Sequence, residues 1–397
     1  MNSQLFGAAA ASRPSAQSRR LRFDRSEWSG AFGDLGTDLP LLVGMILAAG
    51  LDAASVLTVF GLMQIATALR YRMPMPVQPL KAMAAIVIAT KLPGNLLYGG
   101  GLAIGLSMLV LSATGWIDWI SRAVPKPVVR GIQCGLGLQL AGIALRDYVH
   151  ADGATGLWLA GAGFTLAVFL IGRRRVPAAV ILVLLGVAYA FAFKLDAGAM
   201  AGAAGIHLPK WHQPTFADIW SGFLVLALPQ IPLSIANSVL ATRQLAEDLF
   251  PERGITARKI GWTYSIMNLL NPFLGGVPTC HGSGGMAGHY AFGGRTGGSV
   301  VIYGGVFIVL GVVFGPGFDT VVQVFPLPIL GVLLLFEAIT LLALLRDLAM
   351  QAAGLTLAIL VGLIASSLPY GYLIGLIIGI LCFHLSRRGL TRLGAGK

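Results

Sequence analysis

Charge is scarce in this sequence. Only 11% of its 397 residues are charged, whereas 56% are hydrophobic and the mean hydropathy is +0.79. A soluble enzyme would need a much larger polar surface, so the composition predicts a protein that crosses a membrane several times. Long uncharged runs recur from about residue 31 to the end, so this prediction does not depend on one segment.

Cysteine is also rare. The three cysteines, Cys134, Cys280 and Cys382, lie apart in apolar stretches, which excludes a disulfide framework and any metal-ligand spacing. The first 29 residues are polar and arginine-rich and lack the apolar core of a signal peptide. The sequence contains no G-x-x-x-x-G-K-[ST] loop for ATP. We therefore expect no metal, no cofactor and no catalytic residue.

Basic residues exceed acidic ones, with 28 Lys and Arg against 16 Asp and Glu. Such an excess would suit nucleic acid, but its placement follows membrane topology instead. If the N-terminus is in the cytoplasm, all but five basic residues fall on the cytoplasmic side. The exceptions are Lys91, Arg146, Lys194 and Lys210 outside, and Lys81 within the membrane. We therefore expect no nucleic-acid partner, and both termini in the cytoplasm.

Hydrophobic runs between polar loops predict an all-α polytopic membrane protein with fourteen segments. They are expected at about 30–50, 52–70, 78–91, 95–115, 127–145, 155–172, 176–195, 216–240, 260–275, 282–292 and 298–315, from Pro328, and at 350–366 and 370–386. The longest charged loop is expected from Arg243 to Lys259. The expected parts are a cytoplasmic tail (1–29), a first repeat (30–195), an extracytoplasmic connection (196–214), a second repeat (215–386) and a cytoplasmic C-terminal tail (387–397).

Segments 1–7 and 8–14 look like two copies of one unit. Val124-Pro-Lys-Pro-Val-Val, at the start of segment 5, matches Phe325-Pro-Leu-Pro-Ile-Leu, at the start of segment 12, and the corresponding prolines are 201 positions apart. Because each copy has an odd number of segments, the second would be inverted across the membrane. Interrupted segments at corresponding positions of such repeats point to a transporter binding site.

Two stretches, 74–85 and 276–295, interrupt segments 3 and 10 at corresponding positions. Their prolines lack amide donors and force extended geometry on the preceding residue, and the glycines after Pro278 weaken a helix. Each stretch therefore predicts a short extended segment followed by a half-helix that spans about half of a ~30 Å hydrocarbon core. Two half-helix N-termini at one cavity would form an anion site.

Three motifs resemble the molybdate-transporter family of plants and bacteria, a relative of the sulfate permeases. They are Phe32-Gly-Asp-Leu-Gly-Thr-Asp-Leu-Pro40, Pro74-Met-Pro-Val-Gln-Pro-Leu-Lys81 and Pro278-Thr-Cys-His-Gly-Ser-Gly-Gly-Met-Ala-Gly-His-Tyr-Ala-Phe-Gly293. The resemblance covers 30–386 and implies a seven-plus-seven inverted repeat in the cell membrane. It further implies a core domain (segments 1–4 and 8–11), a gate domain (5–7 and 12–14) and a tetrahedral oxyanion between segments 3 and 10. We expect no soluble regulatory domain after segment 14, and this expectation favours molybdate over sulfate.

A dianion in a low-dielectric cavity needs many hydrogen-bond donors and some positive potential. Candidate substrate-binding residues lie at the two breaks and in segment 8: Gln78, Pro79, Leu80, Lys81, Thr279, Cys280, His281, Gly282, Ser283 and Gln230. Asn237 and Ser238 are further candidates for the cavity wall. The glycines at 282, 284 and 285 would let the backbone approach a ligand, or they would serve tight helix packing.

Buried charges have two interpretations each. Lys81 sets the potential of the cavity, or it forms an ion pair with an acidic residue of segment 1. Asp34 and Asp38 are one helical turn apart, and either would pair with Lys81, carry a coupling proton or cap a broken helix. Glu337 carries a coupling proton or makes structural hydrogen bonds. His281 is the better ligand candidate, and His289 is assigned to packing.

These observations predict a secondary active transporter of a tetrahedral oxyanion, molybdate first, that works by alternating access. The alternatives are sulfate, another anion or a nucleobase carried by the same fold, and a passive channel. An intramembrane hydrolase that uses Ser283 and His281 is disfavoured, because side chains two positions apart diverge on a helix. Candidate partners are the oxyanion, a coupling proton, the lipid bilayer and a second copy of the chain in a homodimer.

Overall fold

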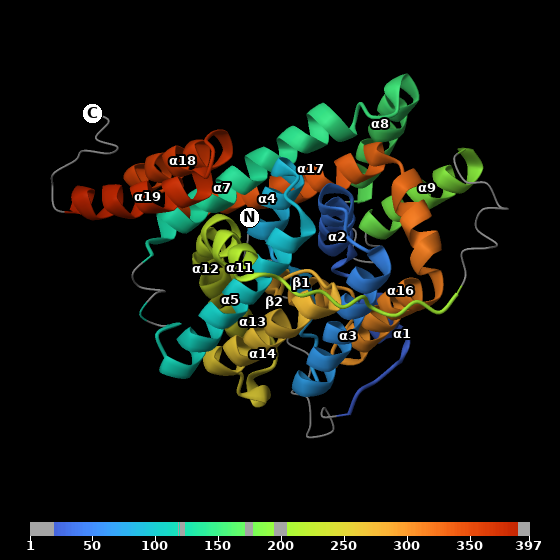
Figure 1. Cartoon of the computed structure of the whole chain (residues 1–397), viewed down its shortest axis with the longest axis horizontal. Helices are drawn as coiled ribbons and strands as arrows, with labels where there is room; N and C mark the ends of the chain where they lie inside the picture. The colour runs from blue at the N-terminus through green and yellow to red at the C-terminus, as the bar shows by residue number, and fades with distance from the viewer. Residues whose placement is uncertain (1–19, 118, 120–123, 171–177, 194–204, 388–397) are drawn as a thin grey trace.

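The computed structural model describes residues 20–117, 119, 124–170, 178–193 and 205–387, and these are mostly helical (Figure 1). Parts of our predictions lie outside the described residues. They are the start of the N-terminal tail, the loop that contains Arg173, Arg174 and Arg175, residues 196–204 of the predicted connection 196–214, and the C-terminal tail from 388 on.

Helices of the first half lie over stretches predicted as membrane segments. Their bounds are α1 (Arg25–Ala31), α2 (Leu35–Ala49), α3 (Ala53–Tyr71), α4 (Lys81–Thr90), α5 (Gly94–Thr114), α7 (Lys126–Ile143), which η2 (Ala144–Tyr148) continues, α8 (Gly153–Leu170) and α9 (Ala178–Phe193).

The second half begins with a long, locally irregular helix. It consists of α11 (Phe216–Gly222), η3 (Phe223–Ala227), α12 (Leu228–Leu233), η4 (Ser234–Ala241) and α13 (Thr242–Leu249). The remaining elements are η5 (Pro251–Arg253), α14 (Ala257–Leu270), η6 (Asn271–Leu274), α15 (Ser283–Ala291), α16 (Gly298–Val324), α17 (Leu327–Ala343), η7 (Leu344–Leu348), α18 (Ala352–Ser367) and α19 (Gly371–Arg387).

Six helical stretches among the described residues are long and apolar enough to cross a membrane, or seven if α1 and α2, which meet at 42°, count as one span. They are Ala53–Tyr71, Gly94–Thr114, Lys126–Tyr148, Gly153–Leu170, Phe216–Leu249 and Leu327–Leu348. The chain is therefore a multi-pass helical membrane protein. The full count of fourteen segments stays a prediction.

Two short strands lie near the middle of the molecule (Figure 1). Strand β1 (Val77–Pro79) precedes α4, and β2 (Thr279–His281) precedes α15, so both predicted breaks contain extended backbone. The strands pair antiparallel, with Gln78 opposite Cys280. The helices that follow are short, with ten residues in α4 and nine in α15. We did not predict the pairing itself.

Helices α3 and α16 pack with their backbones in direct contact. A Cβ atom added at Gly61 would lie 2.5 Å from the Gly304 carbonyl oxygen, and one added at Gly304 would lie 2.6 Å from that of Gly61. Beside this point the rings of Phe60 and Phe307 meet edge to face, 4.9 Å apart. Small residues at a crossing allow close packing between apolar helices that lipid would otherwise separate.

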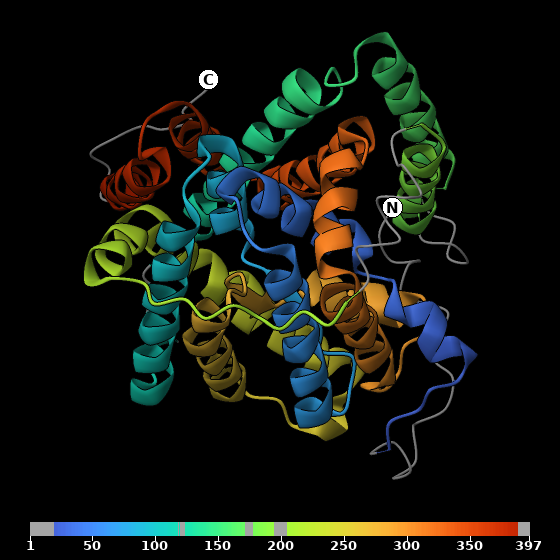
Figure 2. The ribbon, with the colours of Figure 1, turned by 45° about the vertical axis from the view of Figure 1, so that its right-hand side comes forward.

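Residues 205–214, which we call the strap, run across the outside of several helices (Figure 2). The amide of His207 donates to Val312 of α16 at 2.9 Å, and that of His212 to Phe273 of η6 at 2.9 Å. The amide of Lys210 donates to the hydroxyl of Ser55 in α3 at 2.9 Å. The strap therefore joins elements from both halves of the chain.

Part of the predicted charged loop from Arg243 to Lys259 is helical, which corrects that prediction. Helix α13 continues to Leu249, because the sequence is amphipathic there. Ala246 and Phe250 are buried in a cluster with Met75 and Met286, while Arg243 pairs with Glu247 on the exposed face at 3.5 Å. The helix was not predicted, because the charged residues of its exposed face made the stretch resemble a polar loop.

The described end of the predicted N-terminal tail is docked on the protein. Glu27 of α1 is fully buried, and its carboxylate accepts hydrogen bonds from the amides of Arg295, Thr296 and Ser299 at 3.0, 2.9 and 2.9 Å. These amides lie at the start of α16, where a helix has free donors and a positive dipole end. Glu27 thus caps α16.

The α3–α16 crossing gives a prediction with a matched control in the next residue. Gly304→Ala forces a methyl group against the backbone of Gly61, whereas a Cβ at Gly305 meets nothing within 4 Å. We expect Gly304→Ala to lower the free energy of unfolding by about 1–3 kcal/mol. Thermal unfolding of the detergent-solubilised protein measures this difference. Equal melting temperatures for Gly304→Ala and Gly305→Ala would contradict the close crossing.

Candidate functional site

A partly open cavity of about 180 Å³ lies beside the paired strands. Its walls come from β1, β2 and the starts of α4 and α15 on one side, and from α7, α12, η4 and α17 on the other. The polar residues that line it are Gln78, Lys81, Gln133, Gln230, Asn237, Ser238, Cys280, His281, Ser283 and Thr340. Most of the predicted site residues are therefore brought together, although Pro79, Leu80 and Thr279 are not part of this lining.

A side-chain carboxamide closes the outer edge of each strand. Gln64 of α3 donates to the Val77 carbonyl at 2.6 Å and accepts from the Val77 amide at 2.8 Å. Asn268 of α14 does the same for Thr279, at 2.6 and 2.9 Å. All of these groups are buried, and unpaired strand edges are costly away from water. We call Gln64 and Asn268 the edge clamps.

Our sequence analysis missed both edge clamps. A signal was available, because both are carboxamides on apolar stretches that precede a proline break, Gln64 alone on its stretch and Asn268 three residues before Asn271. A buried amide side chain can pair with one donor and one acceptor of an extended backbone, as a neighbouring strand would.

The start of α4 is already occupied by a protein side chain. Gln230 accepts hydrogen bonds from the amides of Ala82 and Met83 at 2.9 and 3.4 Å and donates to Ser234 at 3.0 Å. The Leu80 amide, another predicted anion donor, donates to the Pro278 carbonyl at 3.0 Å. Gln230 therefore reaches the cavity wall, but its carboxamide caps α4. The predicted use of the Leu80 amide as a free donor is wrong.

The start of α15 differs, because its N-cap residue Gly282 has no side chain with which to cap the helix. No side chain of the described residues accepts a hydrogen bond from the amide of Ser283 or Gly284. A Cβ at Gly282 would lie 1.7 Å from Gln78 Oε1, and one at Gly285 would lie 2.1 Å from Asp34 Oδ2, so these two glycines serve close packing. A Cβ at Gly284 would meet nothing within 4 Å, and this residue lines the cavity. Open space beside the first turn of α15 is where a ligand could approach its amides.

The buried charges pair differently from our expectation. The Lys81 ammonium lies 2.5 Å from Glu337 Oε1 of α17, which replaces the expected pair with a carboxylate of segment 1. Asp34 instead accepts two hydrogen bonds from the Gln78 side-chain nitrogen, at 2.7 and 2.8 Å. Asp38 accepts one from the Tyr303 hydroxyl at 3.0 Å. Although Asp34 precedes α2, its side chain makes no capping hydrogen bond.

Two predicted side-chain ligands have structural roles instead. The His281 ring is fully buried, lies 2.7 Å from the Thr263 hydroxyl and packs against Tyr71. Successive residues of a strand point to opposite faces, so this ring points away from the face of Cys280. The Thr279 hydroxyl accepts from Asn271 at 3.0 Å. His289 contacts Ser299 and Tyr303, in keeping with a packing role.

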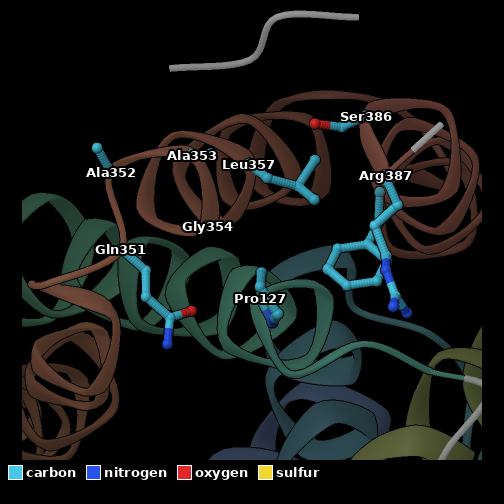
Figure 3. A pocket seen from close by; sticks show the side chains of 9 residues that line it. Pro127, Gln351, Ala352, Ala353, Gly354, Leu357, Ser386 and Arg387 are labelled. Carbon is cyan, nitrogen blue, oxygen red and sulfur yellow. The ribbon is translucent and has the colours of Figure 1, made fainter. Parts of the chain in front are cut away.

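A second cavity, of about 390 Å³, lies between α7, α18 and α19. Gln351 and Arg387 lie on opposite sides of it, with Pro127 between them (Figure 3). None of the predicted site residues lines this cavity. The cavity beside the strands remains the candidate site.

Paired breaks beside a polar cavity in a multi-pass helical protein are typical of membrane transporters. Comparison with solved structures concerns the fold. The fold is similar to the transmembrane domain of a cyanobacterial bicarbonate transporter, BicA, with a TM-score of 0.64, 17% identity and coverage of 86% of this chain and 97% of that one. It is also similar to murine Slc26a9 in the inward-facing state, with a TM-score of 0.69, 12% identity and coverage of 93% and 69%. At these identities the likeness concerns the fold alone.

The chain belongs to the molybdate transporter family. The family model described as "Molybdate transporter of MFS superfamily" matches residues 26–140 and 222–341. Molybdate transporter 2 of Arabidopsis thaliana is 33% identical over 91% of this chain and 89% of its own length. Molybdate transporter 1 of the same plant is 32% identical, with coverage of 81% and 80%. The resemblance found in the sequence is confirmed, and the chain is a transporter rather than an enzyme.

The edge clamps give a prediction about stability. Gln64→Leu and Asn268→Leu each leave a buried amide and a buried carbonyl without their partner, at a cost of about 1–3 kcal/mol per unsatisfied group. We expect both variants to melt well below the wild type in thermal unfolding. Gln244→Leu, a carboxamide on the exposed face of α13, should melt like the wild type. Wild-type melting of the two clamp variants would show that the clamps are dispensable.

Proposed function

We propose that this chain is a secondary active transporter of a tetrahedral oxyanion, molybdate first, and that it works by alternating access. The observation that carries the proposal is the cavity beside the paired strands, with a lysine and an uncapped helix start at its wall. The names of its relatives in Arabidopsis thaliana support molybdate as the substrate. Sulfate is the runner-up because the two anions share shape and charge.

The anion would bind near the start of α15. Lys81 supplies a positive charge, and the amides of Ser283 and Gly284 supply donors without a full opposing charge, which keeps binding reversible. The side chains of Gln78 and Ser238 line the same space. Because Gln230 occupies the amides at the start of α4, we place the anion closer to α15 than to α4.

The proposal includes the seven-plus-seven inverted repeat. A two-fold axis in the membrane plane would turn one strand into the other, and β1 and β2 pair antiparallel as such an axis requires. The edge clamps Gln64 and Asn268 also take equivalent positions, each on the helix before its strand. Helices α2–α5 and α11–α16 would form the core, and α7–α9 and α17–α19 the gate. Cytoplasmic termini, a location in the cell membrane and a homodimer stay predictions.

Uptake into proteoliposomes tests this function. We expect saturable, uphill accumulation of labelled molybdate without ATP, and at least a tenfold loss of molybdate affinity in Lys81→Ala, because the cavity loses its positive charge. Lys210→Ala is the control, since Lys210 is exposed and pairs with Asp52 away from the cavity.

Three results would change the conclusion. A requirement for ATP hydrolysis by this chain would exclude secondary transport. Wild-type uptake by Lys81→Ala would exclude the proposed site. Unlabelled sulfate that competes as strongly as unlabelled molybdate would make sulfate the substrate.

A further inference from the structure

Glu337 of α17 contacts Lys81, which lines the cavity, although Glu337 itself is not part of the lining. One of its carboxylate oxygens lies 2.5 Å from the Lys81 ammonium on α4. The other accepts a hydrogen bond from the Thr37 hydroxyl on α2 at 3.4 Å. Glu337 is only 6% exposed. In the proposed domain division, a gate side chain is therefore held by two core side chains.

Lys81 carries the only ammonium or guanidinium group among the described residues that line the cavity. The Lys81 side chain is 28% exposed, whereas Glu337 is buried. A partly desolvated cation beside a buried carboxylate gains from the pairing, so Glu337 stabilises Lys81 while the site is empty. An oxyanion that uses Lys81 needs the same ammonium. Glu337 and the substrate anion therefore compete for one group.

We propose that Glu337 is a tethered competitor of the substrate anion. It neutralises Lys81 in the empty site, and oxyanion binding requires that its carboxylate be displaced or take up a proton. Either event opens the contact between α17 and α4, so occupancy of the site is linked to separation of the gate from the core. This inference rests on the proposed function, because it assumes an anion at Lys81.

The surroundings of Glu337 make the proposal sensitive to pH. Asp34, the residue before α2, and Asp38 of α2 are hydrogen-bonded to Gln78 and Tyr303, and α4 contributes Lys81. Helix α8 carries no titratable group among its described residues. The remaining titratable groups on elements that pack against α17 are Lys126, Arg130, Cys134, Arg146, Asp147, Tyr148, Tyr189, Arg346 and Asp347. Of these, Lys126 and Arg130 pair with Asp347 at the end of α17. Glu337 is thus the carboxylate in direct contact with the ammonium, and a proton on it frees Lys81.

The test is the dissociation constant of molybdate for purified protein, measured from acidic to neutral pH. For the wild type we expect binding to tighten as the pH falls. For Glu337→Gln we expect about tenfold tighter binding at neutral pH and little pH dependence, because the competing charge is gone. Asp347→Asn is the matched control, since it neutralises a paired carboxylate on the continuation of α17 and should keep the wild-type values and profile.

Two further variants separate competition from a structural role. In a Lys81→Ala background, Glu337→Gln should leave the dissociation constant unchanged, because the group under competition is missing. Glu337→Asp shortens the side chain but keeps its charge. The Glu337→Asp variant should bind molybdate more tightly than the wild type and retain the pH dependence. It replaces Glu337→Gln in the test if Glu337→Gln does not fold.

The outcomes distinguish the two proposals. Suppose that the wild type binds molybdate, and that Glu337→Gln binds it equally or more weakly with the wild-type pH profile. This result would overturn the proposal that Glu337 competes with the substrate, but the proposed transport function would stand. The same holds if Glu337→Asp, used in its place, binds no more tightly than the wild type. If the wild type binds neither molybdate nor sulfate, the proposed function fails and this inference fails with it.

Discussion

The structure depends on one constraint, which is that backbone polar groups in an apolar environment must find partners within the protein. Both chain breaks expose such groups. The breaks satisfy each other through the β1–β2 pair, and Gln64 and Asn268 close the two remaining edges. Extended backbone can therefore persist in the protein interior, where α4 and α15 can begin. The cavity exists because this small sheet is complete.

Charged groups in the interior follow the same rule, because they too have partners within the protein. Each buried carboxylate near the cavity has a donor from another element: Gln78 for Asp34, Tyr303 for Asp38 and Lys81 for Glu337. The two helix starts differ, since Gln230 caps α4 whereas no side chain caps α15. The two halves thus share a backbone plan and differ in the side chains around it. On that difference rests our proposal that an anion binds near α15 rather than near α4.

The sequence predicts what depends on local chemistry. The positions of both breaks could be predicted from prolines and glycines, and those of the helices from apolar runs. These residues lie within a few positions of the structure that they determine. The partner of Lys81 could not be predicted, since Glu337 is 256 positions away and no periodicity connects them. The hydrogen bonds of His281 to Thr263 and of Thr279 to Asn271 were not predicted, because they depend on which face of β2 each side chain takes. That face is set by the register with β1, some two hundred residues earlier in the chain.

Each half of the chain contributes one strand to the central pair, and neither half contains a second strand among its described residues. A polypeptide that carried one half alone would keep its edge clamp yet leave the inner edge of its strand bare. It could complete that edge only by meeting another such polypeptide in the opposite orientation. The halves are therefore complementary parts of one folding unit rather than two domains placed side by side.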